Sequence, residues 1–345
     1  MINLKYSYNG NEIHPSIDVV SDIVPYLGGI TMKEFYTDYK KCAEAWKIAA
    51  KALKDYYGDL FPIPRPSGAP LSYGHLVSIG APIFYPEDGE PNVKPFADST
   101  DEAIEILSGS KDFSDNPLFQ HYMDMSKYFA DEFYDGRFYF LGAGAQGPLT
   151  SAVLMRGLDF LFDIYDEPEK SKDFLYLMTN SIIGYQKFCR RINGEPEITN
   201  GGGMTDDFAS LIPPDMWDEF VIPYINQEFE GLSNGAYRYM HIENLTPKHL
   251  KHLKTLKLNH YQPTVSAALT IENIKENTDI PFDWTLPSYV LTEMTEMEIE
   301  DWIDSTVHAG ITSIHTEICA FTAKQNKLDK AFAFLKGFEK YEVKL

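Results

Sequence analysis

Two segments of the sequence place histidine and acidic residues at alternate positions. The first carries His241 and Glu243, and the second carries His315, Glu317 and Cys319. Alternate residues of a β-strand point to the same side, so each segment, as a strand, presents its polar side chains on one face. Imidazole, carboxylate and thiolate are ligands that Zn²⁺ accepts in proteins. The spacing indicates either a metal site or histidine–glutamate pairs hydrogen-bonded in a polar cleft.

The elements that position these residues are short apolar or alternating runs separated by helical patterns. We predict strands at 60–65, 82–85, 138–142, 197–200, 237–243, 258–262, 282–286 and 311–319. Helical patterns cover 31–57, 117–134, 150–165, 167–194, 213–231, 246–256, 295–308 and 323–341. Strands that alternate with helices favour a parallel sheet, and this number of strands favours a single (β/α)₈ barrel over an open doubly wound sheet.

A glycine-rich segment, Gly142-Ala-Gly144-Ala-Gln-Gly147, has the spacing of a dinucleotide-binding fingerprint. That fingerprint needs a helix and then a second strand ending in an acidic residue about 20 positions on. Here Pro148 follows directly, and the acidic residues at about that distance, Asp166-Glu-Pro-Glu, lie between two helical patterns. We therefore predict a close-packed turn with proline at the start of a helix, not a nucleotide site.

The adjacent residues Asp206 and Asp207 follow three glycines and a predicted strand. Glycines let the backbone approach a ligand closely, and paired carboxylates bind a cation or a polar substrate. A loop with solvated carboxylates, or a helix N-cap, explains the same residues. The pattern leaves both interpretations open.

Composition excludes several classes of protein. The formal charge is −21, and a field of that sign repels phosphate backbones, so we expect no nucleic-acid partner. Three widely separated cysteines do not suggest a disulfide framework. The N-terminal residues lack an apolar signal-peptide region, and the most apolar stretch, 151–165, is too short for a bilayer. We expect a cytoplasmic protein without a membrane partner.

Several motifs together resemble the uroporphyrinogen decarboxylase superfamily, and most of all its zinc-dependent corrinoid/thiol methyltransferase branch. They are Tyr73-Gly-His75, the runs 79–81 and 85–91, Gly144-Ala-Gln-Gly147-Pro148, Asp206-Asp207-Phe, the run 212–223 and the two His-x-Glu strands. The resemblance spans most of the chain. It implies one barrel domain over residues 1–345, with 1–58 as an N-terminal helical extension packed on it.

The sequence departs from the superfamily pattern in two places. Arg65 is the only arginine before Arg137, too few to hold a substrate with many carboxylates, so porphyrinogen decarboxylation is not expected. Glu243 stands where the resembling methyltransferases carry cysteine. An oxygen ligand in place of sulfur still suits zinc, but it makes the site harder and less electron-rich.

The resemblance implies that zinc is held by His241, Glu243 and either Cys319 or Glu317. The implied reaction moves a methyl group between a corrinoid protein, as partner, and a thiol or similar small-molecule acceptor. The other implied site residues are Asp206 and His315 as reacting or supporting groups, and His75, Asp207, Gln262 and Trp284 as substrate-binding residues. Two alternatives stay open: a metal-free lyase acting on a small carboxylated substrate, and a non-catalytic tetrapyrrole- or corrinoid-binding protein.

Overall fold

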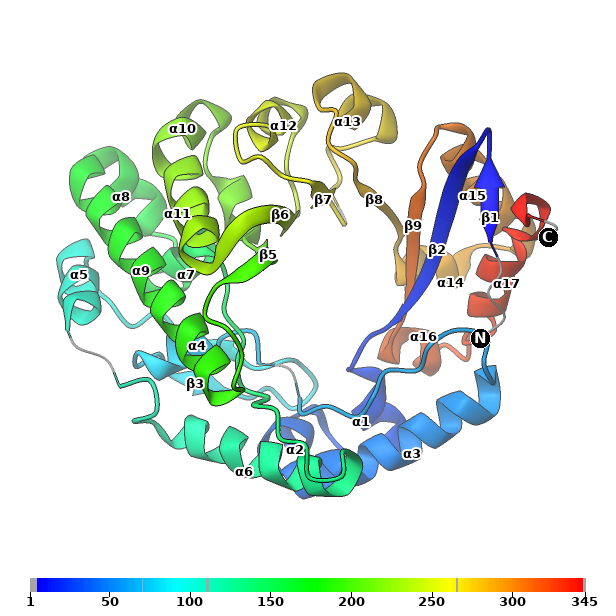
Figure 1. Cartoon of the computed structure of the whole chain (residues 1–345), viewed down its shortest axis with the longest axis horizontal. Helices are drawn as coiled ribbons and strands as arrows, with labels where there is room; N and C mark the ends of the chain where they lie inside the picture. The colour runs from blue at the N-terminus through cyan, green and yellow to red at the C-terminus, as the bar shows by residue number, and fades with distance from the viewer. Residues whose placement is uncertain (1–4, 70, 110–111, 265, 344–345) are drawn as a thin grey trace.

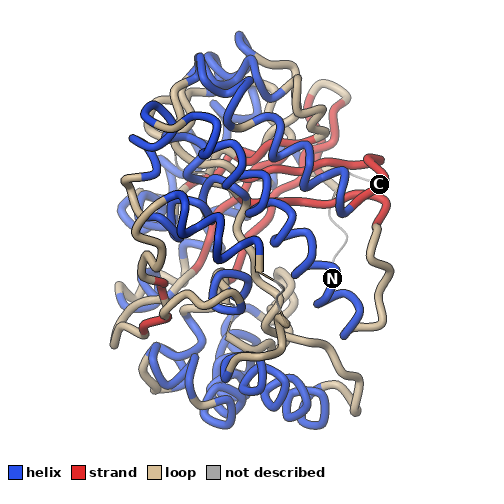
Figure 2. Tube along the Cα trace, turned by 90° about the vertical axis from the view of Figure 1, so that its left-hand side faces the viewer, coloured by secondary structure: helices blue, strands red, loops and turns tan. Residues whose placement is uncertain are grey.

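Parallel strands lie around the centre of the molecule, and helices lie outside them (Figure 1). The computed structural model describes residues 5–69, 71–109, 112–264 and 266–343. Turned by 90°, the strands run through the molecule beneath an outer layer of helices (Figure 2). Within those ranges, no helix has the length and apolar character needed to cross a membrane.

The described residues contain the strands of three sheets, of which two are largely parallel and meet at one bridge. The strands are β1 (Tyr6–Tyr8), β2 (Asn11–Val19), β3 (Ile83–Phe84), β4 (Asn92–Val93), β5 (Thr199–Thr205), β6 (Ser233–His241), β7 (His260–Gln262), β8 (Asp283–Leu286) and β9 (Ser313–Ile318). One sheet has the order β5-β6-β7, and the other has β8-β9-β2 with β1 antiparallel at its edge. A parallel bridge between Tyr261 and Phe282 joins β7 to β8. The parallel strands therefore follow one another from β5 to β2.

The strands as described establish an α/β fold with mixed sheets but do not show an eight-stranded barrel. Strands β6 to β9 lie at the predicted positions. The prediction at 197–200 overlaps β5 only at 199–200, because the strand continues through the three glycines that were predicted to follow it. The segments 60–65 and 138–142 contain no strand, and 82–85 contains only β3, paired with β4. Pro62 and Pro64 cannot donate to a ladder. In the other segment, the N–H groups of Phe140 and Leu141 donate to the side chains of Asn193 and Ser126.

The N-terminal region holds a strand that the sequence pattern did not indicate. Residues 1–58 were expected to be helical, yet β2 pairs in parallel with β9, placing Ser16 opposite His315 and Asp18 opposite Glu317. The polar residues and Pro15 hid this strand, because β-propensity favours apolar and branched side chains. Its partner lies almost 300 residues away in the sequence, so local pattern could not reveal the pairing.

The helices cover the outer faces of the sheets. They are α1 (Ile23–Gly28), α2 (Met32–Thr37), α3 (Tyr39–Tyr57), α4 (Gly74–Ser78), α5 (Thr100–Ser108), α6 (Pro117–Phe133), α7 (Pro148–Arg156), α8 (Phe160–Asp166), α9 (Pro168–Ile192), α10 (Trp217–Phe220), α11 (Ile222–Leu232), α12 (Pro247–Leu253), α13 (Ile271–Asn277), α14 (Ser288–Glu293), α15 (Glu296–His308), α16 (Ala320–Lys324) and α17 (Lys330–Lys336), with short 3₁₀ turns at 207–211, 214–216 and 339–341.

Four predicted helices are each divided. The range 213–231 contains a 3₁₀ turn, α10 and α11, and the range 323–341 contains the end of α16, α17 and a 3₁₀ turn. The pattern over 31–57 breaks at Asp38, which has an extended backbone and whose carboxylate accepts hydrogen bonds from the N–H groups of Lys40 and Lys41. The pattern over 150–165 breaks at Gly157, whose φ of 84° suits glycine. Apolar periodicity continues across these breaks, so the sequence pattern predicts one helix where the structure has two.

Helix starts follow the predicted local chemistry. Thr295 and Glu298 form the predicted capping box at the start of α15. Pro148 is the first residue of α7, as predicted for the turn after the glycine-rich segment. A Cβ atom on Gly144 would lie 1.6 Å from the carbonyl oxygen of Leu71, so only glycine allows this close approach. The close-packed turn is confirmed.

The two faces of the strands differ in polarity. In β9, Ile314, Thr316 and Ile318 are fully buried against the surrounding helices, while the alternate residues are only partly buried. Burying an isoleucine side chain contributes about 1.5–3 kcal/mol, so the outer face holds the strand in place. The opposite face carries His315 and Glu317 toward the centre. The apolar face therefore sets the register that places the polar residues.

Candidate functional site

An acidic cluster of Asp207, His241 and Glu243 lies where β5 and β6 end. The Nε2 atom of His241 is 3.4 Å from Oδ1 of Asp207 and 3.8 Å from Oε1 of Glu243. The backbone N–H of Glu243 donates to the same Asp207 oxygen over 3.0 Å. The strand register explains why these side chains lie together. Thr205 and His241, the last residues of β5 and β6, lie opposite each other, so the two strands end at the same level.

The other ring nitrogen of His241 is held from the neighbouring strand. Its Nδ1 atom is 2.9 Å from Oε1 of Gln262, the last residue of β7, and 3.2 Å from Oγ1 of Thr264. The imidazole is thus fixed on one side by neutral groups and directed on the other side toward two carboxyl groups. This arrangement can accept or donate a proton at Nε2.

Glu243 and Glu317 share an environment that favours their protonated forms. Burial raises the pKa of Glu243, and the charge of Asp207 raises it further, while His241 lowers it. Burial also raises the pKa of Glu317, with Asp18, Asp22 and Glu243 adding to the effect and His241 opposing it. Among the described residues, no lysine or arginine is a cause of either shift. The ends of β6 and β9 therefore face one acidic space.

His315 is bonded at both ring nitrogens and does not join the acidic cluster. Its Nδ1 atom is hydrogen-bonded to the hydroxyl of Ser16. Its Nε2 atom is 3.1 Å from Oδ1 of Asp283 and 2.9 Å from Oγ of Ser313. Burial lowers the pKa of His315, but the hydrogen bond and charge of Asp283 outweigh it and the pKa is raised.

Asp206 caps a helix and does not face the acidic cluster. The side chain is fully buried, and its two carboxylate oxygens accept the N–H groups of Leu149 at 3.1 Å and Thr150 at 2.7 Å, in the first turn of α7. Burial raises the pKa of Asp206 to about 6, against the lowering effect of these bonds. Of the two adjacent aspartates, Asp206 thus accepts the first N–H groups of α7, whose N-cap position is Gly147, and Asp207 belongs to the site.

The predicted metal ligands do not form a ligand shell in this arrangement. Cys319 is the N-cap of α16, and its sulfur lies 3.6 Å from the hydroxyl oxygens of both Ser288 and Thr322. Across the described parts of the chain, no three or more His, Cys, Asp and Glu side chains form a group that could hold a metal ion. Zinc binding therefore remains a prediction.

Two predicted substrate-binding residues lie apart from the acidic cluster. His75 is buried in α4, where its Nε2 atom is 2.9 Å from Oγ of Ser181 in α9, and burial lowers its pKa to about 3. Trp284 packs against both hydrophobic cores and edge-on against Phe282. It follows Asp283 in β8 and so faces the opposite side of the sheet.

Sequence reasoning missed Asp283, the residue that connects the two His-x-Glu strands. Its Oδ1 atom is 2.7 Å from Nε2 of His260 and 3.1 Å from Nε2 of His315, and its Oδ2 accepts from Gln262 over 3.4 Å. The available signal was the period-2 spacing of His260 and Gln262, which marks the inward face of β7. The prediction that Trp284 binds substrate assumed that Trp284 faces the centre, whereas in β8 it is Asp283 that does so.

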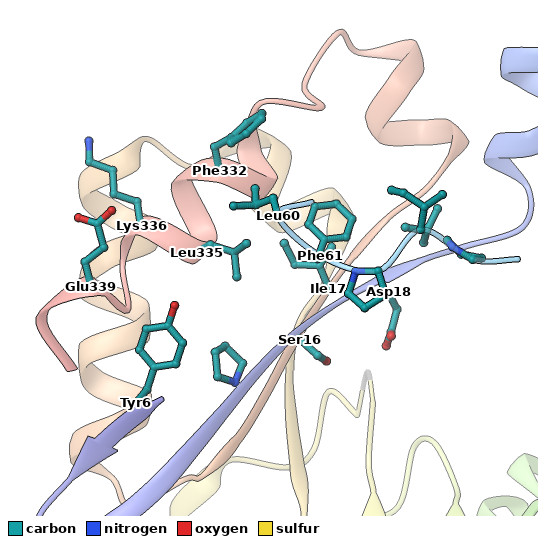
Figure 3. Close-up of a pocket in the computed structure, with 15 residues that line it drawn as sticks. Tyr6, Ser16, Ile17, Asp18, Leu60, Phe61, Phe332, Leu335, Lys336 and Glu339 are labelled. Atoms are coloured by element: carbon teal, nitrogen blue, oxygen red, sulfur yellow. The ribbon is translucent and has the colours of Figure 1, made fainter. Parts of the chain in front are cut away.

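A cavity of about 870 Å³ opens between β2, residues 60–64 and α17, apart from the acidic cluster (Figure 3). Leu60, Phe61 and Leu335 give it an apolar wall. Ser16, the partner of His315, also lines the cavity. The cavity therefore borders the polar centre along the part of β2 that lies beyond its pairing with β1.

Comparison with known families agrees with this arrangement. Residues 27–279 match the family model described as Uroporphyrinogen decarboxylase (URO-D). None of the curated proteins compared with the chain matches it. The family consists of enzymes and implies a TIM-barrel fold, and the matched region contains β5, β6 and β7 with the acidic cluster at their ends. Because the match covers well over half of the sequence, the chain belongs to the uroporphyrinogen decarboxylase family.

Proposed function

We propose that this chain is a methyltransferase of the uroporphyrinogen decarboxylase family, with the acidic cluster as its acid–base group. One observation carries the proposal: Nε2 of His241 faces the carboxyl groups of Asp207 and Glu243 at 3.4 and 3.8 Å. A methyl acceptor such as a thiol needs a base to remove its proton before it becomes a nucleophile. An imidazole beside carboxylates provides such a base.

In the proposed reaction, the acceptor gives its proton to Nε2 of His241. The freed electron pair of the acceptor forms a bond to the methyl carbon, and the bond between that carbon and its carrier breaks with its electron pair left on the carrier. The Asp207 carboxylate stabilises the imidazolium that forms. A corrinoid protein is the proposed carrier, and a thiol the proposed acceptor.

The charge of the site disfavours the polycarboxylate substrates that a porphyrinogen decarboxylase must hold. Glu243, Glu317 and Asp207 line the space, and among the described residues no lysine or arginine contributes to the pKa shift of either glutamate, so the space offers no cation to pair with substrate carboxylates. An uncharged or cationic substrate fits this field better. The charge therefore favours methyl transfer within this family.

The same family supports a proposal for the fold. We propose that 60–69 and 138–146 occupy two strand positions of a single-domain (β/α)₈ barrel between β2 and β5. In support, the N–H of His75 donates to the carbonyl of Gly144, and the N–H of Gly147 donates to that of Thr205 at the end of β5. Hydrogen exchange would test it, because barrel positions protect their backbone amides.

Methyl transfer from methylcobalamin to a thiol, followed by the absorbance change of the corrinoid, tests the function. We expect turnover by the wild-type protein and a loss of about 100-fold or more in His241→Gln, the usual size of an acid–base contribution. His308→Gln, an exposed histidine at the end of α15, is the matched control and keeps full activity. Wild-type protein without turnover for any thiol tested overturns the proposal.

A metal-free lyase is the second candidate, and one observation favours it: the imidazole of His241 and the carboxyl groups of Asp207 and Glu243 lie together as an acid–base group. It predicts release of CO₂ from a small carboxylated substrate, insensitive to chelators. Zinc analysis of the purified protein tests the predicted metal separately. One zinc per chain that is lost in His241→Ala and Cys319→Ala would support the zinc prediction and contradict the role of His241 as a free base, whereas CO₂ release without methyl transfer favours the lyase.

A further inference from the structure

A chain of hydrogen bonds runs through the polar centre from β9 to β6. Asp283 in β8 is 6% exposed, and its Oδ1 atom lies 3.1 Å from Nε2 of His315 and 2.7 Å from Nε2 of His260. Its Oδ2 accepts from Nε2 of Gln262 over 3.4 Å. The Oε1 atom of Gln262 then lies 2.9 Å from Nδ1 of His241. The two His-x-Glu strands are thus joined through one carboxylate and one amide.

Asp283 stays a carboxylate within this chain. Burial raises its pKa, but the hydrogen bonds from His260 and His315, together with that from Ser313, outweigh burial and the pKa is lowered. An ionised carboxylate only accepts hydrogen bonds. Asp283 therefore orients the Gln262 amide with its NH₂ group toward β8 and its carbonyl oxygen toward His241.

This orientation determines which nitrogen of His241 carries the proton in the neutral ring. The Gln262 carbonyl is an acceptor, so Nδ1 must donate to it. The hydroxyl of Thr264, 3.2 Å from Nδ1, accepts equally well. Nε2 is then left with its lone pair directed at the acidic cluster, where a base requires it.

We propose that Asp283 is a positioning residue that sets the tautomer of His241 from two strands away, through Gln262. The proposal rests on the proposed function in one respect, that His241 acts as an acid–base group. Asp283 itself bonds to His260, His315 and Gln262 and to no member of the acidic cluster. Its effect on the reaction is therefore transmitted by the amide of Gln262.

The test is the tautomer of His241, read from the ¹⁵N chemical shifts of its ring in histidine-labelled protein above pH 8. Wild-type protein is expected to show the Nδ1–H tautomer. Asp283→Asn introduces an NH₂ group that lets the Gln262 amide turn over, so we expect a mixture of tautomers. Gln262→Leu removes the bridge without disturbing the His315–Asp283 pair, and it should produce the same mixture if Asp283→Asn fails to fold.

Kinetics give the second measurement. Asp283→Asn should lower kcat by about 10- to 100-fold, the size found for partners that orient a functional histidine, with KM nearly unchanged. Asp283→Glu keeps an acceptor-only group and should recover part of that loss. Asp279→Asn is the matched control, because its carboxylate is 78% exposed in the loop before β8, and it should change nothing.

The outcomes separate the two proposals. An Nε2–H tautomer in wild-type protein, or a tautomer that stays the same in Asp283→Asn and Gln262→Leu, overturns the positioning role. A tautomer that shifts as expected, combined with full activity in His241→Gln, supports the positioning role and rejects the acid–base function of His241.

Discussion

The same short pattern, His-x-Glu, occurs on β6 and β9 and leads to two different histidines. His241 has one nitrogen held by the amide of Gln262, and the other lies 3.4 and 3.8 Å from carboxyl oxygens, beyond a normal hydrogen bond. His315 has both nitrogens in hydrogen bonds, to Ser16 and Asp283. One imidazole is free to exchange a proton, and the other is part of the framework.

The glutamates of the two patterns differ less than the histidines do. Burial and neighbouring carboxylates raise the pKa of both Glu243 and Glu317. What separates the strands is the neighbour at the level of each histidine: β7 offers an amide to His241, whereas β8 offers a carboxylate to His315. A sequence motif therefore does not determine a role until its neighbouring strands are known.

The largest expected effect is a difference in turnover between variants of Glu243 and Glu317. Glu243→Gln removes one of the two carboxyl groups beside Nε2 of His241, at 3.8 Å, so we expect a loss of about 100-fold in turnover. Glu317→Gln changes the field of the site without touching His241 and should cost less than about tenfold on the same scale. The methyl-transfer assay measures both. Equal losses would mean that β6 and β9 contribute alike and would contradict the comparison.

The second prediction concerns stability. His315→Ala leaves the Asp283 carboxylate, only 8% exposed in its side chain, with one histidine partner fewer, which should lower the free energy of unfolding by about 3 kcal/mol. His241→Ala should lower it by less than about 1 kcal/mol, since it breaks a bond to a neutral amide. Urea denaturation with a common m-value measures the difference. A larger loss in His241→Ala would reverse the assignment of framework and site.

The adjacent residues Asp206 and Asp207 also differ in role: the first stabilises the fold and the second belongs to the site. Asp206→Ala leaves two N–H groups of α7 without their acceptor and should destabilise by about 1–2 kcal/mol. Asp207→Ala should leave the unfolding free energy nearly unchanged and act on turnover instead. Thermal unfolding of the two variants side by side distinguishes them, and the idea fails if Asp207→Ala is the less stable of the two.

The smallest effect is the pH dependence of the His315 contribution. Its pKa is raised above the ordinary 6.5 in the folded state, so the contribution is fully present below about pH 6.5 and is lost as the pH rises through the folded pKa. The difference in unfolding free energy between wild type and His315→Gln should therefore be larger at pH 5.5 than at pH 9. A difference that grows with pH would show that Asp283 does not hold a protonated His315.

Local chemistry made part of the fold and site predictable. Capping at Thr295, proline at the start of α7 and period-2 alternation in β9 depend on residues near one another in sequence, and all three are observed. The strand β2 and the break at Gly157 were missed. The first depends on a distant partner strand, and the second on a left-handed backbone angle that apolar periodicity does not report.

The sequence by itself determined which side chains share a face: His241 with Glu243, and His315 with Glu317, because the period of a strand is two. It also determined the acidic character of the centre. Only the tertiary structure decided what each face meets. Strand order placed the amide of Gln262 beside His241 and the carboxylate of Asp283 beside His315, and it directed Asp206 to a helix and Asp207 to the site. Proton affinity depends on such neighbours within a few ångströms, and these come from strands that are remote in the sequence.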